Sequence, residues 1–127
     1  MNFIIQYNEF CLNYLRCIKK IANSFSLTQS QVLCIKSIPF DGISQNNLAN
    51  SLSLDISTLS RNLDKLKTMK IIMKEQSLAD KRSSIITLTS KGKTIYNQII
   101  NSMHNNISQI LLNVDINDLE YFIEILN

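Results

Sequence analysis

The sequence predicts a mostly α-helical chain that contains one small β-hairpin. Only two glycines and one proline occur in 127 residues, which favours long helices with few tight turns. Apolar residues recur at spacings of three and four near both ends of the chain, as they do along the buried face of a helix. Between these segments, two short runs rich in isoleucine, 71–76 and 84–88, have the composition of β-strands. The length fits one domain, 1–127.

The first predicted helix covers about residues 2–23. Its apolar residues share one face and are Phe3, Tyr7, Phe10, Cys11, Tyr14 and Ile18. The Ser-Leu-Thr segment at 26–28 offers a cap for a second helix. This helix should end near Ile38, because Pro39 disfavours helical geometry in the residue before it.

Two short helices then follow in close succession. Ser44 is a good N-cap for a helix over 45–52, and Asp55 is a good N-cap for a second helix that runs to about Met69. The buried stripe expected on the second helix is Ile56, Leu59, Leu63 and Leu66. Two short helices joined by a tight turn form a helix-turn-helix.

The remaining elements form a wing and two further helices. Strands at 71–76 and 84–88 enclose a polar tip, 77–83, and so predict a hairpin. Thr89 caps a long helix whose apolar stripe continues to Leu111, and a last helix begins at Asp115 or Asn117. The order predicts a mostly α fold with a small two-stranded β wing: a winged helix-turn-helix with a helical region built from both termini.

The net charge of +3 is distributed unevenly along the chain. Residues 1–60 carry four basic and three acidic groups, residues 61–93 carry nine and three, and residues 94–127 carry none and four. The middle segment therefore has a charge of +6 and is the part that would face a polyanion. A lysine-rich surface can also be merely solvated, so charge alone leaves both readings open.

Several function classes are disfavoured by the sequence. It has no charged leader and no apolar run of membrane length, which favours a cytoplasmic protein with no membrane contact. Cys11, Cys17 and Cys34 form no CxxC pair and stand beside no histidine cluster, so neither a disulfide framework nor a metal site is supported. His104 is a lone histidine. We expect no cofactor, and no motif indicates an enzyme.

One face of the predicted helix after Asp55 has the chemistry for DNA recognition. Ser57, Thr58, Arg61 and Lys65 fall within about 100° of one another, opposite the apolar stripe, and Ser60 lies at the edge of this arc. Hydroxyl groups can hydrogen-bond base edges or phosphates, and an arginine can pair with guanine through two bonds. Lys65 and Lys74 would bind phosphate. The alternative is that this helix face is merely solvated and does not contact DNA.

Two segments resemble a known family. The wing segment contains Asp80-Lys81-Arg82, then Leu88-Thr89 and Gly92, and the helix-turn-helix contains Leu48-Ala49 and the run from Leu54 to Arg61. Together they resemble the MarR-type winged helix-turn-helix regulators, which are homodimeric transcription factors. The resemblance implies that 28–88 forms the DNA-binding winged-helix part and that 1–24 and 95–127 are dimerisation helices.

The resemblance also implies roles for single residues. Arg82 would enter the minor groove, flanked by Lys81, because a narrow groove concentrates negative potential. Asp80 would pair with a nearby arginine and hold the loop in shape. Lys70 stands where many relatives have a glycine, which suggests that the reading helix ends differently here.

The apolar terminal helices predict a dimer interface. Its expected residues are Phe3, Tyr7, Phe10, Ile107, Leu111, Leu119, Phe122 and Leu126. The alternative is that these side chains all belong to the core of a monomer.

The predicted function is that of a sequence-specific DNA-binding regulator, most often a repressor among proteins of this kind, on a pseudopalindromic operator. Family members release DNA on binding a small aromatic ligand or on oxidation of a cysteine, for which Cys11 is the candidate although such a residue is usually inert core. The competing class is a winged-helix protein-interaction module that dimerises without reading DNA.

Overall fold

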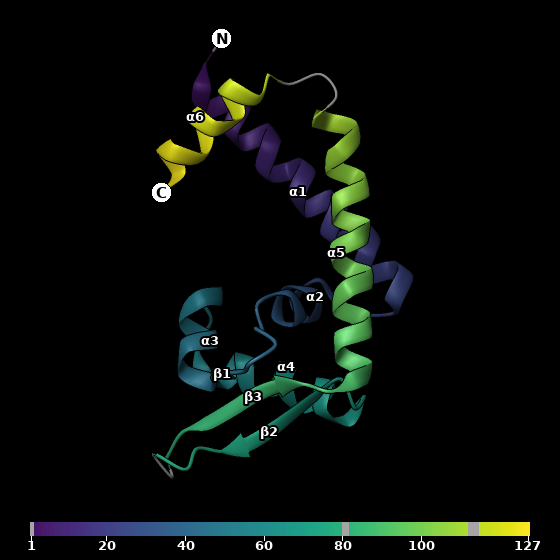
Figure 1. The fold of residues 1–127 in the computed structure, drawn as a ribbon, viewed down its shortest axis with the longest axis vertical. Coiled ribbons are helices and arrows are strands. Elements are labelled where there is room, and N and C mark those ends of the chain that lie inside the picture. Colours follow the sequence, from purple (N-terminus) through teal and green to yellow (C-terminus); the bar gives the residue numbers. More distant parts are fainter. Residues whose placement is uncertain (1, 80–81, 112–114) are drawn as a thin grey trace.

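Long terminal helices and a cluster of short central elements make up the molecule (Figure 1). The computed structural model describes residues 2–79, 82–111 and 115–127. Its elements are α1 (Phe3–Phe25), α2 (Gln29–Lys36), β1 (Ile43–Ser44), α3 (Gln45–Leu52), α4 (Ile56–Thr68), β2 (Ile72–Gln76), β3 (Ser84–Leu88), α5 (Ser90–Leu111) and α6 (Ile116–Leu126). The mostly α fold with a small β wing is thereby confirmed.

The small sheet has three antiparallel strands in the order β1-β3-β2. The predicted wing is β2 and β3, which pair in register from Ile72 opposite Leu88 to Gln76 opposite Ser84. The sequence did not predict β1, whose Ile43 pairs with Ile86 on the other edge of β3. A strand of two residues is too short to show the alternation by which strands are recognised.

Most helix boundaries follow from their caps. The Thr28 hydroxyl accepts a hydrogen bond from the Gln31 backbone N–H at 3.1 Å, and the Gln31 side-chain oxygen accepts one from the Thr28 backbone N–H at 2.9 Å, which forms a capping box at the start of α2. This helix ends at Lys36, within two residues of the predicted end, and the Ile38 N–H still donates to the Ile35 carbonyl at 3.3 Å. Of the two starts considered for the last helix, Asp115 is the N-cap of α6.

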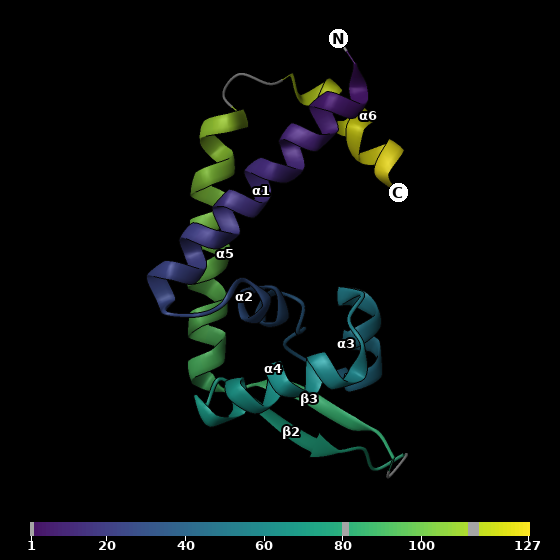
Figure 2. The ribbon, with the colours of Figure 1, turned by 180° about the vertical axis from the view of Figure 1, so that it is seen from behind.

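The core lies at one end of the molecule, where α2 crosses between the long helices and the helix-turn-helix (Figure 2). Its fully buried side chains include Ile18, Val32, Ile35, Leu48, Leu59, Leu63, Leu66, Ile86 and Ile99. Within the described residues, every buried hydrophobic side chain lies between Cys17 and Ile99 in the sequence. The short elements and the adjoining parts of α1 and α5 therefore form one packed unit.

The opposite end consists of the first half of α1, the end of α5, and α6 (Figures 1 and 2). Here α6 lies beside α1, and Phe122 packs edge-on against Phe10 with ring centroids 5.4 Å apart. Its ring also lies 6.5 Å from that of Tyr7. In the described part of the chain, none of the helices combines the length and apolar character that crossing a membrane requires.

Candidate nucleic-acid interface

The helix-turn-helix consists of α3, a tight turn and α4. The turn is closed by Ser53, which has a left-handed backbone with φ of 52°, and by a hydrogen bond from the Leu54 N–H to the Ala49 carbonyl at 3.0 Å. Asp55 then caps α4 by accepting the Thr58 backbone N–H at 2.6 Å. Because this hydrogen bond favours the carboxylate, it holds the pKa of Asp55 below its usual value, and the Ser57 hydroxyl at 2.8 Å adds to the effect.

The side chains on α4 divide into a buried and an open face. Leu59, Leu63 and Leu66 are buried to 1% exposure or less, as the stripe predicted, but Ile56 is 48% exposed. The prediction for Ile56 was wrong because it is the first residue of the helix and lies at the rim of the packed surface.

The predicted polar arc occupies the open face of α4. Ser57, Arg61 and Lys65 are exposed, whereas Thr58 and Ser60 are half-buried. The guanidinium of Arg61 donates to the Thr58 hydroxyl at 3.4 Å, so the two side chains lie together. The structure therefore gathers two cations and three hydroxyl groups on the helix that the sequence selected for reading DNA.

The end of α4 differs from the sequence expectation. Lys70 has a φ of 62°, which is the left-handed conformation that a glycine adopts more easily. The Lys70 N–H donates to the Lys67 carbonyl and the Ile71 N–H donates to the Leu66 carbonyl, a pair of bonds that defines a Schellman motif. The lysine thus keeps the helix ending of a glycine, at a conformational cost of about 1 kcal/mol.

The wing extends from the same end of the molecule as α4 (Figure 1). Lys74 on β2 and Arg82 in the tip, just before β3, are both exposed. Below the tip, the Ser77 N–H donates to the Ser83 carbonyl at 3.0 Å and continues the hairpin. Asp80 and Lys81, which we also selected, lie outside the described residues.

The start of α5 is fastened to the end of α4. The Thr89 hydroxyl donates to the Lys70 carbonyl at 2.6 Å and accepts the Gly92 N–H at 3.0 Å, while the Lys91 ammonium donates to the Met69 carbonyl at 2.9 Å. A Cβ on Gly92 would lie 2.0 Å from the Ile71 carbonyl oxygen, so only glycine permits this approach. This junction gives a physical reason for the Thr89 and Gly92 of the wing segment.

Two contacts between helices were not found by sequence reasoning. Asn62 on α4 donates to the Ser30 hydroxyl on α2 at 2.8 Å. At the other end of α2, the Lys36 ammonium donates to the Tyr14 hydroxyl on α1 at 2.6 Å. The partners are 32 and 22 residues apart in sequence, so no local sequence pattern predicts either contact.

The predicted dimerisation residues lie on the terminal helices, and those whose side chains are described are partly exposed. Tyr7, Phe10 and Ile107 are 40–45% exposed, and Leu119 and Phe122 are half-buried. The side chains of Phe3, Leu111 and Leu126 are outside the described part.

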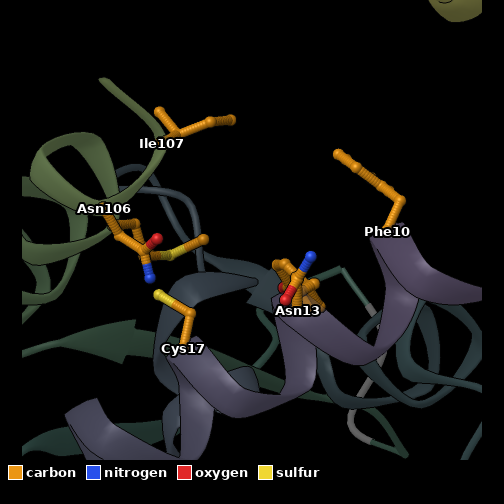
Figure 3. A pocket seen from close by; sticks show the side chains of 7 residues that line it. Phe10, Asn13, Cys17, Asn106 and Ile107 are labelled. Carbon is orange, nitrogen blue, oxygen red and sulfur yellow. The ribbon is translucent and has the colours of Figure 1, made fainter. Parts of the chain in front are cut away.

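A cavity of about 90 Å³ lies between α1 and α5 (Figure 3). Its lining consists of Phe10, Asn13, Tyr14, Cys17, Met103, Asn106 and Ile107. Figure 3 shows Cys17 on α1 facing Asn106 on α5 across this space. The lining is mainly apolar and aromatic and includes the amide groups of Asn13 and Asn106, which is the character of a small-molecule pocket.

The three cysteines have different surroundings. Cys11 is half-buried, whereas Cys17 and Cys34 are buried. Burial raises the pKa of the Cys34 thiol to about 11, so this group stays protonated and unreactive at neutral pH. The described residues contain no cluster of His, Cys, Asp and Glu that could hold a metal ion, and His104 is exposed on α5.

Comparisons with known proteins agree with this arrangement. The family model described as transcriptional regulator SarA/Rot matches residues 16–99, nearly the same span as the packed core. No curated protein matches the chain.

Solved structures share the fold. Apo wild-type MarR from E. coli is 21% identical, with a TM-score of 0.83 over 99% of this chain and 96% of that one. A MarR transcriptional regulator from Methanosarcina mazei Go1 is 21% identical, with a TM-score of 0.81 over 98% and 93%. MepR from S. aureus, solved as a complex with DNA, is 18% identical, with a TM-score of 0.79 over 99% and 94%. At these identities the matches establish the winged-helix fold.

Proposed function

Because the chain belongs to the SarA/Rot family of transcriptional regulators, we propose that it binds a pseudopalindromic DNA site as a homodimer and represses the genes behind it. Membership in this family and the shared fold confirm the MarR-type regulator expected from the sequence. The single observation that carries the proposed DNA contact is the open face of α4, where Arg61, Lys65 and three hydroxyl groups lie together.

The proposed contacts divide into those that recognise bases and those that bind the DNA backbone. Arg61, with Ser57 and Thr58, would meet base edges in the major groove, and Ser60 would flank them. Lys65 and Lys74 would bind phosphates, and these contacts would add affinity without sequence information. Arg82, Lys81 and Asp80 would form the wing contact, with Arg82 in the minor groove. The DNA complex of the structural neighbour MepR supports this use of the fold.

The homodimer would supply the symmetry of the site. Exposed apolar side chains on α1, α5 and α6 would meet their copies across a two-fold axis, with the predicted residues Phe3, Tyr7, Phe10, Ile107, Leu111, Leu119, Phe122 and Leu126. Two reading helices would then meet half-sites about one turn of DNA apart. In this proposal 28–88 binds DNA, and 1–24 and 95–127 dimerise, within the single domain 1–127.

An input signal would release the DNA. The cavity between α1 and α5 supports a small aromatic effector, because Phe10 and Tyr14 line it. Oxidation of Cys11 is the alternative input, supported by its partial exposure where the other two thiols are buried.

The test is DNA selection from a randomised pool with the purified protein, followed by binding measurements on the recovered duplex. We expect one recovered motif with two-fold symmetry and a fall in affinity of roughly 10³-fold between about 50 and 200 mM salt. Arg61→Ala and Arg82→Ala should each weaken binding about ten-fold. Lys67→Ala is the control, because Lys67 is exposed on α4 but outside the polar arc.

The competing function is a protein-interaction module that has lost DNA recognition. It requires that the pool yields no motif and that binding to random duplex shows no steep salt dependence. Equal losses for Arg61→Ala and Lys67→Ala would likewise contradict the reading face, because they would reduce the effect of α4 to bulk charge.

A further inference from the structure

We propose that a cationic stripe on α1 of one copy of the chain binds an acidic stripe on α6 of a second copy, and that these charges select the partner and align the two copies. The inference rests on the proposed homodimer and names the charged residues by which one copy recognises the other. The α1 stripe lies outside the set of apolar residues predicted for the interface.

The α1 stripe consists of Leu12, Arg16 and Lys20, which lie one helical turn apart and are all exposed. Its two cations line an open cleft of about 460 Å³, whose other lining residues are Asn13, Cys17, Lys19, Asn23 and Asn106. The Arg16 guanidinium donates to the Asn13 side-chain oxygen at 2.8 Å, which holds it at the cleft. Among the described residues that line this cleft there is no Asp or Glu. The cleft therefore suits an anionic partner.

The α6 stripe repeats the same order with the opposite charge. Ile116, Glu120 and Glu124 also lie one turn apart, and all three are exposed. The sequence of α6 contains no Lys or Arg, so its acids have no cation within their own helix.

The acids of the α6 stripe face away from the α1 of their own chain. Phe122 packs edge-on against Phe10, so the Phe122 side of α6 faces α1. Glu120 and Glu124 lie two residues before and after Phe122, which places each of them about 160° around the helix from it. In addition, α6 lies beside the first half of α1, whereas Arg16 and Lys20 belong to the second half (Figure 2). The acids are therefore directed toward another molecule.

The two stripes match in spacing as well as in charge. In each stripe the apolar residue comes first, and the charged residues follow about 6 and 12 Å further along the helix axis. Side by side and parallel, the stripes bring Leu12 opposite Ile116 and each cation opposite an acid. The reversed direction places each apolar residue opposite a charge, which loses hydration of the charge without a partner. The charges thus set the direction in which the helices meet.

A second copy of the chain explains both stripes at once. In a two-fold dimer the α1 stripe of each copy meets the α6 stripe of the other, so every contact forms twice. Like charges one turn apart repel each other within each helix, and a partner of opposite charge relieves this repulsion in both. A DNA duplex could also meet the cations of α1, but it would leave the acids of α6 without a role.

The experiment reverses each stripe separately. The first variant is Arg16→Glu with Lys20→Glu, and the second is Glu120→Lys with Glu124→Lys. Sedimentation equilibrium gives the dimer dissociation constant of each variant, of their equimolar mixture and of the wild type. The matched control is Lys67→Glu with Lys74→Glu, because both lysines are exposed and lie outside the terminal helices. Circular dichroism checks that each variant is folded.

We expect the dissociation constant of each reversed variant to rise about 30-fold at about 50 mM salt, because four attractive pairs become repulsive. The equimolar mixture should dimerise within about three-fold of the wild type, because every cation of the mixed dimer again meets an acid. A folding defect cannot be rescued by mixing. The control should match the wild type, and the differences should shrink at about 0.5 M salt.

A wild-type dimer whose dissociation constant neither reversal changes would overturn the inference but leave the homodimer in place. Two weakened variants that do not rescue each other on mixing would also overturn it. If Arg16→Glu with Lys20→Glu weakens DNA binding without changing the dissociation constant of the dimer, the cleft binds nucleic acid and the inference is again wrong. A monomeric wild type would instead overturn the proposed homodimer, and this inference with it.

Discussion

Similar apolar stripes are buried at one end of the molecule and exposed at the other. At the end that contains the helix-turn-helix, the stripes of α2, α3 and α4 meet one another and the sheet, and their side chains are buried. At the other end, Ile5, Phe10, Ile116 and Tyr121 are 45–70% exposed. Periodic apolar residues predict a helix with a face to cover, but they do not say whether the cover comes from the same chain.

The end that contains the helix-turn-helix buries its apolar side chains against other parts of the same chain, and we call it the closed unit. The opposite end leaves its apolar side chains exposed, and we call it the open end. The SarA/Rot match, 16–99, coincides with the closed unit, in which the described buried hydrophobic residues run from Cys17 to Ile99. The described ring contacts of α6 join Phe122 to Tyr7 and Phe10, and they leave most of its apolar surface open. A second copy of the chain would cover that surface, which is why we place the dimer there.

The largest effect is expected when a charged side chain is introduced at the open end. Phe10→Asp would bring a carboxylate into the proposed interface and remove an aromatic anchor, so dimerisation should weaken by about 2–4 kcal/mol and DNA binding should fall with it. Light scattering at micromolar concentration measures the mass, and circular dichroism should still report a folded chain.

The control for this variant is Phe40→Asp in the closed unit. Phe40 is 48% exposed, nearly the same as Phe10 at 45%, but its ring packs edge-on against Tyr96 near the start of α5, with ring centroids 5.1 Å apart, and not against α6. Phe40→Asp should leave the mass measured by light scattering unchanged. A Phe10→Asp protein that is still dimeric, or a wild type that is monomeric, would remove the open end from the mechanism.

The next effect concerns the closed unit. Gly92→Ala would force its Cβ against the Ile71 carbonyl oxygen, because the two atoms would otherwise lie 2.0 Å apart. The free energy of unfolding should fall by about 3 kcal/mol, measured by chemical denaturation at fixed protein concentration. Asn97→Ala, at an exposed position of the same helix, should cost nothing measurable. If the two variants are equally stable, the α4–α5 junction is not as tight as its contacts indicate.

Local chemistry made much of the closed unit predictable. Asp55, Ser44 and Thr28 are caps whose bonds lie within three residues, and each begins a helix where the sequence placed it. The arc from Ser57 to Lys65 could be found in the same way, because a helix converts spacing into a face. The wing strands could be read from their composition and their polar tip.

The parts that escaped prediction depend on distant residues. The strand β1 exists because β3 offers it an edge, and nothing in Ile43 and Ser44 alone indicates pairing. Lys70 keeps a left-handed backbone because Thr89 and Ile71 hold the chain there, which overrides its local preference. Likewise, the Asn62–Ser30 pair becomes visible only when α2 is placed against α4.

The smallest expected effect tests whether the charge of the Asp55 carboxylate stabilises the start of the reading helix. The hydrogen bond from the Thr58 N–H is the main cause that lowers the pKa of Asp55 from its ordinary value of 3.8. The charged carboxylate therefore stabilises the folded state at pH values above 3.8. That contribution is lost as the pH falls through the still lower folded-state pKa. Asp55→Asn keeps an N-cap but does not titrate. Thermal melts from pH 5 to pH 3 should therefore show a steeper loss of stability in the wild type than in Asp55→Asn. Parallel curves would mean that the Asp55 carboxylate gains nothing from folding and that the neutral side chains of α3 and α4 hold the start of the reading helix.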